Sequence, residues 1–130
     1  TYEGMPELLK ELQEKGIKIA VASNKYQEAT TKLVRHYYPG INFIDICGQK
    51  EGIKVKPDPS IVFGILADAC VRKQNVLYVG DSGVDMETAR RACVESVGVT
   101  WGFRTAKELR EFNAGTIVDS PAEILNLINQ

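Results

Sequence analysis

Strand-like and helix-like segments alternate along almost the whole chain of 130 residues. Helix-like segments carry apolar residues three or four positions apart, and strand-like segments are short apolar runs bounded by glycine or polar residues. Repeated strand–helix units of this kind require right-handed crossovers and a mostly parallel sheet covered by helices on both faces. The alternation therefore predicts an α/β fold of three layers with a Rossmann-like parallel sheet. The expected strands are 17–22, 43–47, 75–79, 95–100 and 116–118, with helices between them and a last helix after 120.

Helix boundaries are indicated by capping residues. Asp58-Pro59 resembles an N-cap followed by proline at the first helical position. Two capping-box signatures, Thr105 with Glu108 and Ser120 with Glu123, predict two helix starts near the carboxyl end.

Size and composition favour one domain, 1–130, that acts on a small soluble molecule. The chain is 44% apolar and has a formal net charge of −1, with its basic residues scattered, so we expect no nucleic-acid partner. No apolar run approaches the roughly 20 residues of a membrane span, and the first residues lack the features of a signal peptide. We therefore expect a cytoplasmic protein without a membrane partner.

The three cysteines, Cys47, Cys70 and Cys93, are far apart and form no CxxC pair. Each lies in an apolar pattern, so we expect buried thiols rather than a metal site.

The segment 79–85 places two carboxylates, Asp81 and Asp85, four residues apart where an apolar strand gives way to a helix. In open α/β sheets this edge is where ligands bind, and the helical turn brings both side chains to one side. Hard oxygen ligands of this kind favour Mg²⁺. An alternative interpretation is structural, with Asp81 and Ser82 capping the helix and Asp85 a favourable acid in its first turn.

Two other segments carry polar residues that could serve the same site. Ser23 and Asn24 follow the strand 17–22, and a hydroxyl with free backbone N–H groups at a helix start suits a phosphate. Lys56 lies before Pro57-Asp58-Pro59, where the prolines stiffen the backbone. Taken alone, Ser23-Asn24 is better explained as an ordinary N-cap, and a lone lysine such as Lys56 is usually a solvated one.

Taken together, Ser23-Asn24, Lys56-Pro57-Asp58-Pro59 and Gly80-Asp81-Ser82-x-x-Asp85 resemble, in that order, motifs two, three and four of the haloacid dehalogenase superfamily. The segments 3–16 and 99–104 are similar to its phosphoglycolate-phosphatase-like branch. The resemblance implies an Mg²⁺-dependent phosphomonoester hydrolase that acts on a small phosphorylated metabolite.

The same resemblance implies a role for each of these polar residues. Ser23 and the Asn24 backbone N–H would bind a phosphoryl oxygen, Lys56 would stabilise its charge and Asp81 would bind Mg²⁺ directly. Asp85 would have an indirect catalytic role: it would ligate the metal through water or hold Lys56 in place.

The chain departs from the family pattern in one respect. The family's nucleophile is the first Asp of an Asp-x-Asp pair on an amino-terminal strand, and no Asp-x-Asp occurs here. The cap domain that selects the substrate is absent too. We therefore expect this chain to be the carboxyl-terminal part of a phosphatase, inactive by itself. The missing strand would lie between the strands that precede Ser23 and Asp81, in a slot filled by a separate segment or a second copy.

Two alternatives differ in class. A response-regulator receiver also combines aspartates, a hydroxyl, a lysine and Mg²⁺, but it places an acidic pair first and the lysine last. The second alternative is a non-catalytic module that binds phosphate or a protein through the remaining groups.

Overall fold

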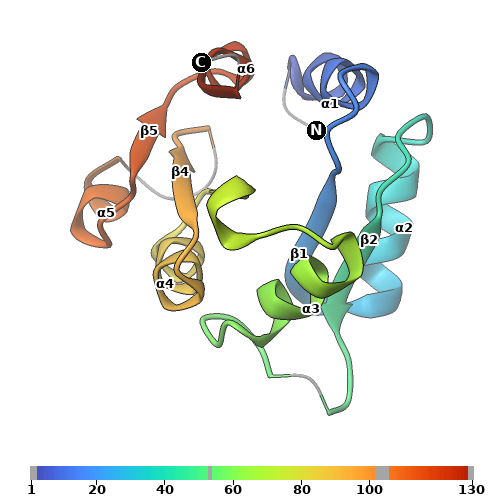
Figure 1. The fold of residues 1–130 in the computed structure, drawn as a ribbon, viewed down its shortest axis with the longest axis horizontal. Coiled ribbons are helices and arrows are strands. Elements are labelled where there is room, and N and C mark those ends of the chain that lie inside the picture. Colours follow the sequence, from blue (N-terminus) through green and yellow to red (C-terminus); the bar gives the residue numbers. More distant parts are fainter. Residues whose placement is uncertain (1–2, 53, 102–105, 129–130) are drawn as a thin grey trace.

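The computed structural model describes residues 3–52, 54–101 and 106–128, and it has the predicted alternation of strands and helices (Figure 1). The strands are β1 (Ala20–Tyr26), β2 (Asp45–Gln49), β3 (Leu77–Gly80), β4 (Glu95–Val99) and β5 (Thr116–Val118). The α-helices are α1 (Met5–Glu14), α2 (Gln27–Tyr37), α3 (Ser60–Ala69), α4 (Gly83–Ala92), α5 (Ala106–Glu111) and α6 (Pro121–Ile128). A short 3₁₀ helix covers Lys73–Asn75.

All strand pairs are parallel, as the alternation predicts, but the strands form two separate sheets. One sheet has the order β1–β2 and the other β3–β4–β5. The main difference from the expected boundaries concerns β1, which continues through Ser23 to Tyr26. This extension arises because Tyr26 pairs with Gln49 after a shift in register.

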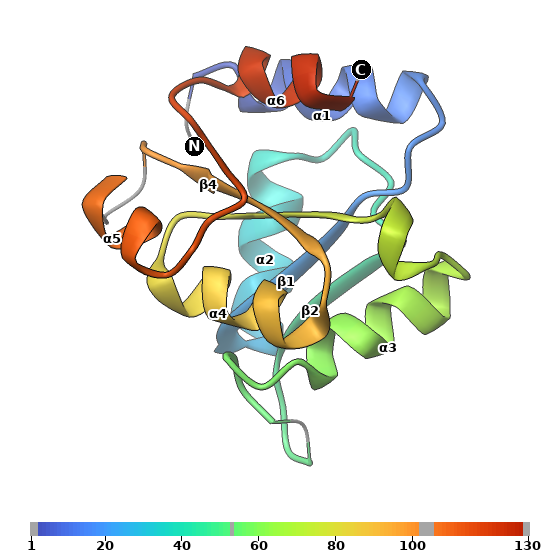
Figure 2. The same cartoon turned by 60° about the vertical axis from the view of Figure 1, so that its left-hand side comes forward.

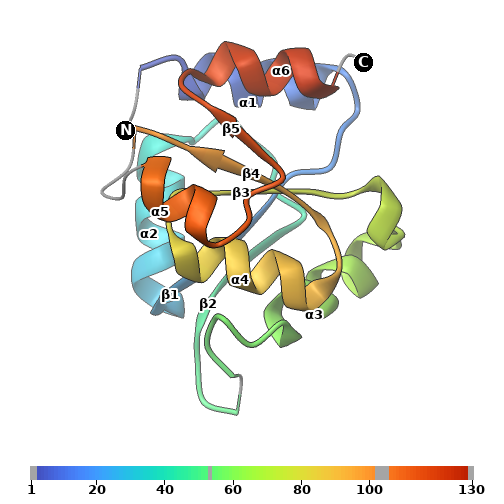
Figure 3. The same cartoon turned by 90° about the vertical axis from the view of Figure 1, so that its left-hand side faces the viewer.

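Helices cover both faces and span the two sheets. Figures 2 and 3 show α1 and α6 together on one side, with α3 and α4 on the opposite side. The first core includes Leu12 of α1, Val97 of β4 and Ile124 of α6, and the second joins α3 and α4 around Ile61 and Ala89. Ala22 of β1, Cys47 of β2 and Tyr78 of β3 pack against the second core, which therefore joins the two sheets. The first core contacts Ile19 and Phe43, in the segments that lead into β1 and β2.

The strands β1 and β3 face each other without pairing. Val21 pairs with Ile46 and Val79 pairs with Val97, so each strand has its described partner on the outer side only. Val79 is apolar and lies within β3, yet it is 41% exposed. The described residues therefore leave β1 and β3 unpaired with each other, and the position between them is called the slot below.

The cysteine prediction was wrong for two of the three residues. Cys70 and Cys93 are exposed, because each ends a helix in the left-handed conformation, with φ of 56° and 60°. Cys47 is half-buried, and burial, followed by hydrogen bonding to Asp45, raises the pKa of its thiol to about 11.

None of the helices in the described part of the chain is long and apolar enough to cross a membrane.

Candidate active site at the strand ends

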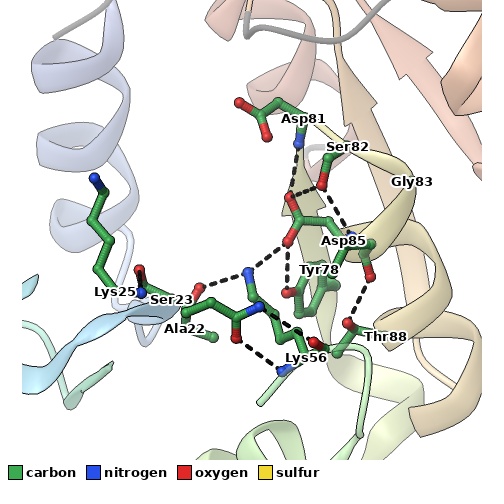
Figure 4. Close-up of polar contacts among 12 residues, drawn as sticks. Ala22, Ser23, Lys25, Lys56, Tyr78, Asp81, Ser82, Gly83, Asp85 and Thr88 are labelled. Carbon is green, nitrogen blue, oxygen red and sulfur yellow. Dashed lines mark hydrogen bonds and ion pairs between the residues drawn. The ribbon is translucent and has the colours of Figure 1, made fainter. Parts of the chain in front are cut away.

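Asp85, in the first turn of α4, is the best-connected side chain at the strand ends (Figure 4). Its Oδ1 accepts hydrogen bonds from Lys56 Nζ at 2.6 Å and from the Tyr78 hydroxyl at 3.2 Å. Its Oδ2 accepts from the backbone N–H of Asp81 at 3.1 Å and from Ser82 Oγ at 3.2 Å. Both carboxylate oxygens are therefore occupied by protein donors.

The two carboxylates of segment 79–85 differ in their electrostatics. Burial raises the pKa of Asp85, but the Lys56 ammonium and the hydrogen bonds outweigh it and hold that pKa below its ordinary value. Burial, and then the Asp85 charge, raise the pKa of Asp81. The Asp81 carboxylate is thus the one that a nearby cation would stabilise most.

Gly80 ends β3 directly against Asp85. A Cβ at position 80 would lie 2.3 Å from the Asp85 Cβ and 2.6 Å from its Cγ. Such distances leave no room for any side chain, so glycine is needed here because the Asp85 side chain folds back over the strand end. The sequence Gly80-Asp81 is therefore a packing requirement of the site.

We expect Gly80→Ala to lower the free energy of unfolding by about 1–3 kcal/mol, because the added methyl group must push Asp85 away from its donors. Gly64→Ala is the matched control, since a Cβ at that position of α3 meets nothing within 4 Å. The control should stabilise the protein by about 0.5–1 kcal/mol. Urea unfolding measures both variants; equal effects would contradict the packing account.

Lys56 reaches the site from the loop before α3 and bonds both β1 and α4. Its Nζ donates to the carbonyl of Ala22 in β1 at 3.2 Å as well as to Asp85 of α4. These two bonds leave its third N–H without a partner among the described residues. The ion pair is well shielded, since the side chains of Lys56 and Asp85 are 10% and 12% exposed.

The backbone of Lys56 is fixed by the side chain of Asn24. Asn24 Oδ1 accepts the Lys56 N–H at 2.9 Å, and Asn24 Nδ2 donates to the Lys56 carbonyl at 3.3 Å. Asp58 Oδ1 accepts the backbone N–H of Ser60 at 2.9 Å, although the N-cap of α3 is Pro59, one residue later than predicted. The loop that carries Lys56 is thus held at both ends.

Ser23 and Asp81 lie on opposite sides of the slot, with the Lys56 ammonium between their strands (Figure 4). Ser23 is half-buried and its Oγ accepts the Lys25 N–H at 3.0 Å, which leaves its own proton available. Figure 4 shows the Asp81 carboxylate directed away from Lys56. The structure therefore brings Asn24, Lys56 and Asp85 into direct contact and leaves Ser23 and Asp81 facing the opening.

Sequence reasoning missed three contacts. The first two are the Asn24 side chain on the Lys56 backbone and the Tyr78 hydroxyl on Asp85. In the third, Glu108 Oε2 accepts the N–H of Gly83 at 2.7 Å and so caps α4 from α5. Glu108 was expected to pair with Thr105, which lies outside the described residues. Phe103 and Arg104 of the segment 99–104 lie outside them as well.

The described residues can supply part of the ligands of a magnesium ion. Asp81 offers a half-buried hard oxygen ligand, whereas the hydrogen bonds of Asp85 already occupy its oxygens. Within residues 3–52, 54–101 and 106–128, no group of three or more His, Cys, Asp or Glu residues could hold a metal. The described residues thus fit Mg²⁺ through one direct carboxylate, with further ligands to come from elsewhere.

Comparison with known proteins agrees with this geometry. The haloacid dehalogenase-like hydrolase family matches residues 1–99. The chain belongs to that family. This haloacid dehalogenase-like chain is 30% identical over 124 residues to a phosphoglycolate phosphatase of Pseudomonas savastanoi pv. phaseolicola, covering 95% of the chain and 46% of that relative. It is 31% identical over 122 residues to a phosphoglycolate phosphatase of Pectobacterium atrosepticum, covering 94% of the chain and 52% of that relative.

Solved structures show the same fold. A protein of Lactobacillus delbrueckii subsp. bulgaricus, assigned as a phosphoglycolate phosphatase, superposes with a TM-score of 0.92 and 36% identity, covering 98% of this chain and 53% of that one. A HAD-superfamily hydrolase of Ehrlichia chaffeensis gives a TM-score of 0.81 at 25% identity, covering 98% and 57%. The haloacid dehalogenase-like chain thus spans about half the length of the curated relatives it matches.

Proposed function

We propose that this chain supplies the phosphate- and Mg²⁺-binding groups of a phosphomonoester hydrolase of the phosphoglycolate-phosphatase type. One observation carries the proposal. Lys56 is fixed between the Ala22 carbonyl of β1 and Asp85 of α4 with one N–H to spare, and Ser23 and Asp81 lie on either side of it. Phosphoryl transfer depends mainly on positioning and charge neutralisation, and these groups supply both.

The phosphate half of the site comes from β1 and the loop before α3. The Ser23 hydroxyl and the Asn24 backbone N–H bind a phosphoryl oxygen. Lys56 neutralises charge on the same phosphoryl group. The Asn24 side chain fixes the backbone of Lys56 beside β1. Asp85 holds the ammonium in place because its other donors, Tyr78 among them, fix its carboxylate.

The metal half of the site comes from the end of β3. Asp81 binds Mg²⁺ directly. Asp85 positions Asp81 because its Oδ2 accepts the Asp81 backbone N–H. When bound, Mg²⁺ offsets the negative charge of the phosphoryl group.

The slot between β1 and β3 accepts a strand that is not part of residues 1–130, from a separate segment or a second copy. That strand would carry the carboxylate nucleophile, which residues 1–130 lack, so the chain alone is inactive. The exposed Val79 edge and the helical layers that span the slot support this assignment. The substrate is a small phosphorylated metabolite in the cytoplasm.

A second candidate is a non-catalytic phosphate-binding module. The lack of an Asp-x-Asp pair in residues 1–130 favours it. Hydrolysis by a protein that includes the completing strand would distinguish the two.

We expect weak Mg²⁺ binding that depends on Asp81. A titration of the chain with MgCl₂ at pH 7, followed by amide NMR shifts, should perturb residues 80–85. Asp81→Asn should abolish these shifts, whereas Glu14→Gln, at an exposed position of α1, should retain them.

The same titration has an expected pH dependence. Since burial and Asp85 raise the pKa of Asp81, binding should begin to weaken at a pH above the ordinary carboxyl value of about 4. Shifts that cluster away from residues 80–85, or that persist in Asp81→Asn, would contradict the assignment.

A further inference from the structure

The first residue of α4 is held by a side chain of another helix, α5. Glu108 Oε2 accepts the backbone N–H of Gly83 at 2.7 Å. A carboxylate is favourable at this position, because the first N–H groups of a helix lack partners within the helix and its dipole attracts negative charge. The two residues are 25 positions apart, so this bond fixes one helix relative to the other.

The position of α5 is itself set by close packing against two glycines. A Cβ at Gly83 would lie 2.6 Å from Phe112 Cδ2, and a Cβ at Gly98 of β4 would lie 3.0 Å from Leu109 Cδ1. Leu109 is completely buried. Glu108 and Phe112 are four residues apart, which brings both to the side of α5 that meets Gly83. The Glu108 carboxylate is therefore delivered to the start of α4 by a rigidly packed element.

The other polar contacts of segment 81–83 come from the start of α4 itself. The Asp81 N–H donates to Asp85 Oδ2 at 3.1 Å, and Ser82 Oγ accepts the Asp85 N–H at 3.3 Å. These two bonds would move together with the helix. The bond from Gly83 to Glu108 instead ties the segment to α5, so it can decide where the segment stands.

We propose that Glu108 is a positioning residue for the magnesium site: it fixes the backbone that carries Asp81 and so sets the affinity for Mg²⁺. Gly83 lies two residues beyond Asp81, so a shift of the Gly83 backbone displaces the Asp81 carboxylate. Mg²⁺ requires near-ideal octahedral geometry, and a displaced ligand therefore lowers its affinity. This inference rests on the proposed role of Asp81 and adds to it a residue outside segment 79–85.

The first test measures Mg²⁺ binding to residues 1–130 with amide NMR shifts of residues 80–85 as the readout. Glu108→Ala should raise the Kd for Mg²⁺ about tenfold, the lower end of what the loss of an outer partner costs a metal site. Glu108→Gln keeps a carbonyl acceptor of the same length without the charge, so it should restore most of the affinity. Glu111→Ala, at an exposed position of the same helix, should leave the Kd unchanged.

The second test separates metal binding from phosphate binding in the protein that includes the completing strand. Glu108→Ala should raise the Mg²⁺ concentration for half-maximal turnover of para-nitrophenyl phosphate about tenfold. At saturating Mg²⁺ the KM for para-nitrophenyl phosphate should stay within about twofold, because the groups proposed to bind phosphate come from β1 and the loop before α3. A general loss of structure would change both quantities.

Glu108→Asp provides a further variant that does not depend on the folding of Glu108→Ala. It keeps the negative charge but is one methylene shorter, so it should also weaken Mg²⁺ binding. An unchanged Kd in the alanine or aspartate variant, or a glutamine variant as weak as the alanine variant, overturns the inference and leaves the role of Asp81 intact. Absence of Mg²⁺-induced shifts at residues 80–85 of the unmodified chain overturns the proposed function as well.

Discussion

Replacing Lys56 by methionine is expected to lower the free energy of unfolding by about 3 kcal/mol at pH 7. The change leaves the Asp85 carboxylate buried without its cation, while methionine preserves most of the apolar stem. Breaking a buried pair costs far more than breaking a surface pair, and the side chains of this pair are only 10% and 12% exposed. Urea unfolding followed by circular dichroism measures the loss.

Lys32→Met is the matched control because it breaks an ion pair at the surface. The Lys32–Glu28 side chains are 76% and 84% exposed, so the control should change stability by less than about 0.5 kcal/mol. A double variant, Lys56→Met with Asp85→Asn, should lose less than the sum of the single changes, because it removes both charges together. Additive losses would contradict a direct interaction between Lys56 and Asp85.

The effect of Lys56→Met should depend on pH in a definite direction. The Lys56 ammonium helps hold the pKa of Asp85 below its ordinary value, so this ion pair stabilises the fold above the unfolded carboxyl pKa of about 4. That contribution is lost as the pH falls through the lower folded pKa. The stability difference between the unmodified protein and Lys56→Met should therefore shrink below about pH 4. A difference that stays constant down to pH 2 would show that the lost packing, not the charge, causes the destabilisation.

Local patterns in the sequence were sufficient to predict the elements that position the site. The apolar runs and caps predict the parallel strands and most helix starts, although α3 begins at Ser60, one residue after the predicted start. The relation of Ser82 to Asp85 was also accessible, because Ser82 is the N-cap of α4 and Asp85 lies in the first turn of that helix. Their separation in the chain is short enough for helix geometry to decide their relation.

Contacts between distant segments were not accessible in the same way. Asn24 and Lys56 are 32 residues apart, and nothing in either segment shows that the Asn24 amide bonds the lysine backbone. The bond from Gly83 to Glu108 spans 25 residues. Such contacts depend on how the loops meet at the sheet edge, which periodicity does not determine.

The cysteine prediction was wrong for a local reason. Apolar periodicity indicates which face of a helix is buried, but it does not indicate where the helix ends. Cys70 and Cys93 each occupy the left-handed position just after the last helical residue, where the chain turns away from the core. The burial predicted for Cys70 and Cys93 from their apolar neighbours was therefore wrong.

The most direct test of the central claim is turnover of para-nitrophenyl phosphate with Mg²⁺ by two proteins. One consists of residues 1–130, and the other adds the residues encoded upstream. We expect no turnover by residues 1–130 above a mock preparation, and Mg²⁺-dependent turnover by the longer protein. Lys56→Met and Asp81→Asn should each reduce that turnover by about 10²–10³-fold, since each removes a group that offsets transition-state charge. Turnover by residues 1–130 that disappears in Asp81→Asn, or full activity of the longer protein carrying Lys56→Met, would contradict the account.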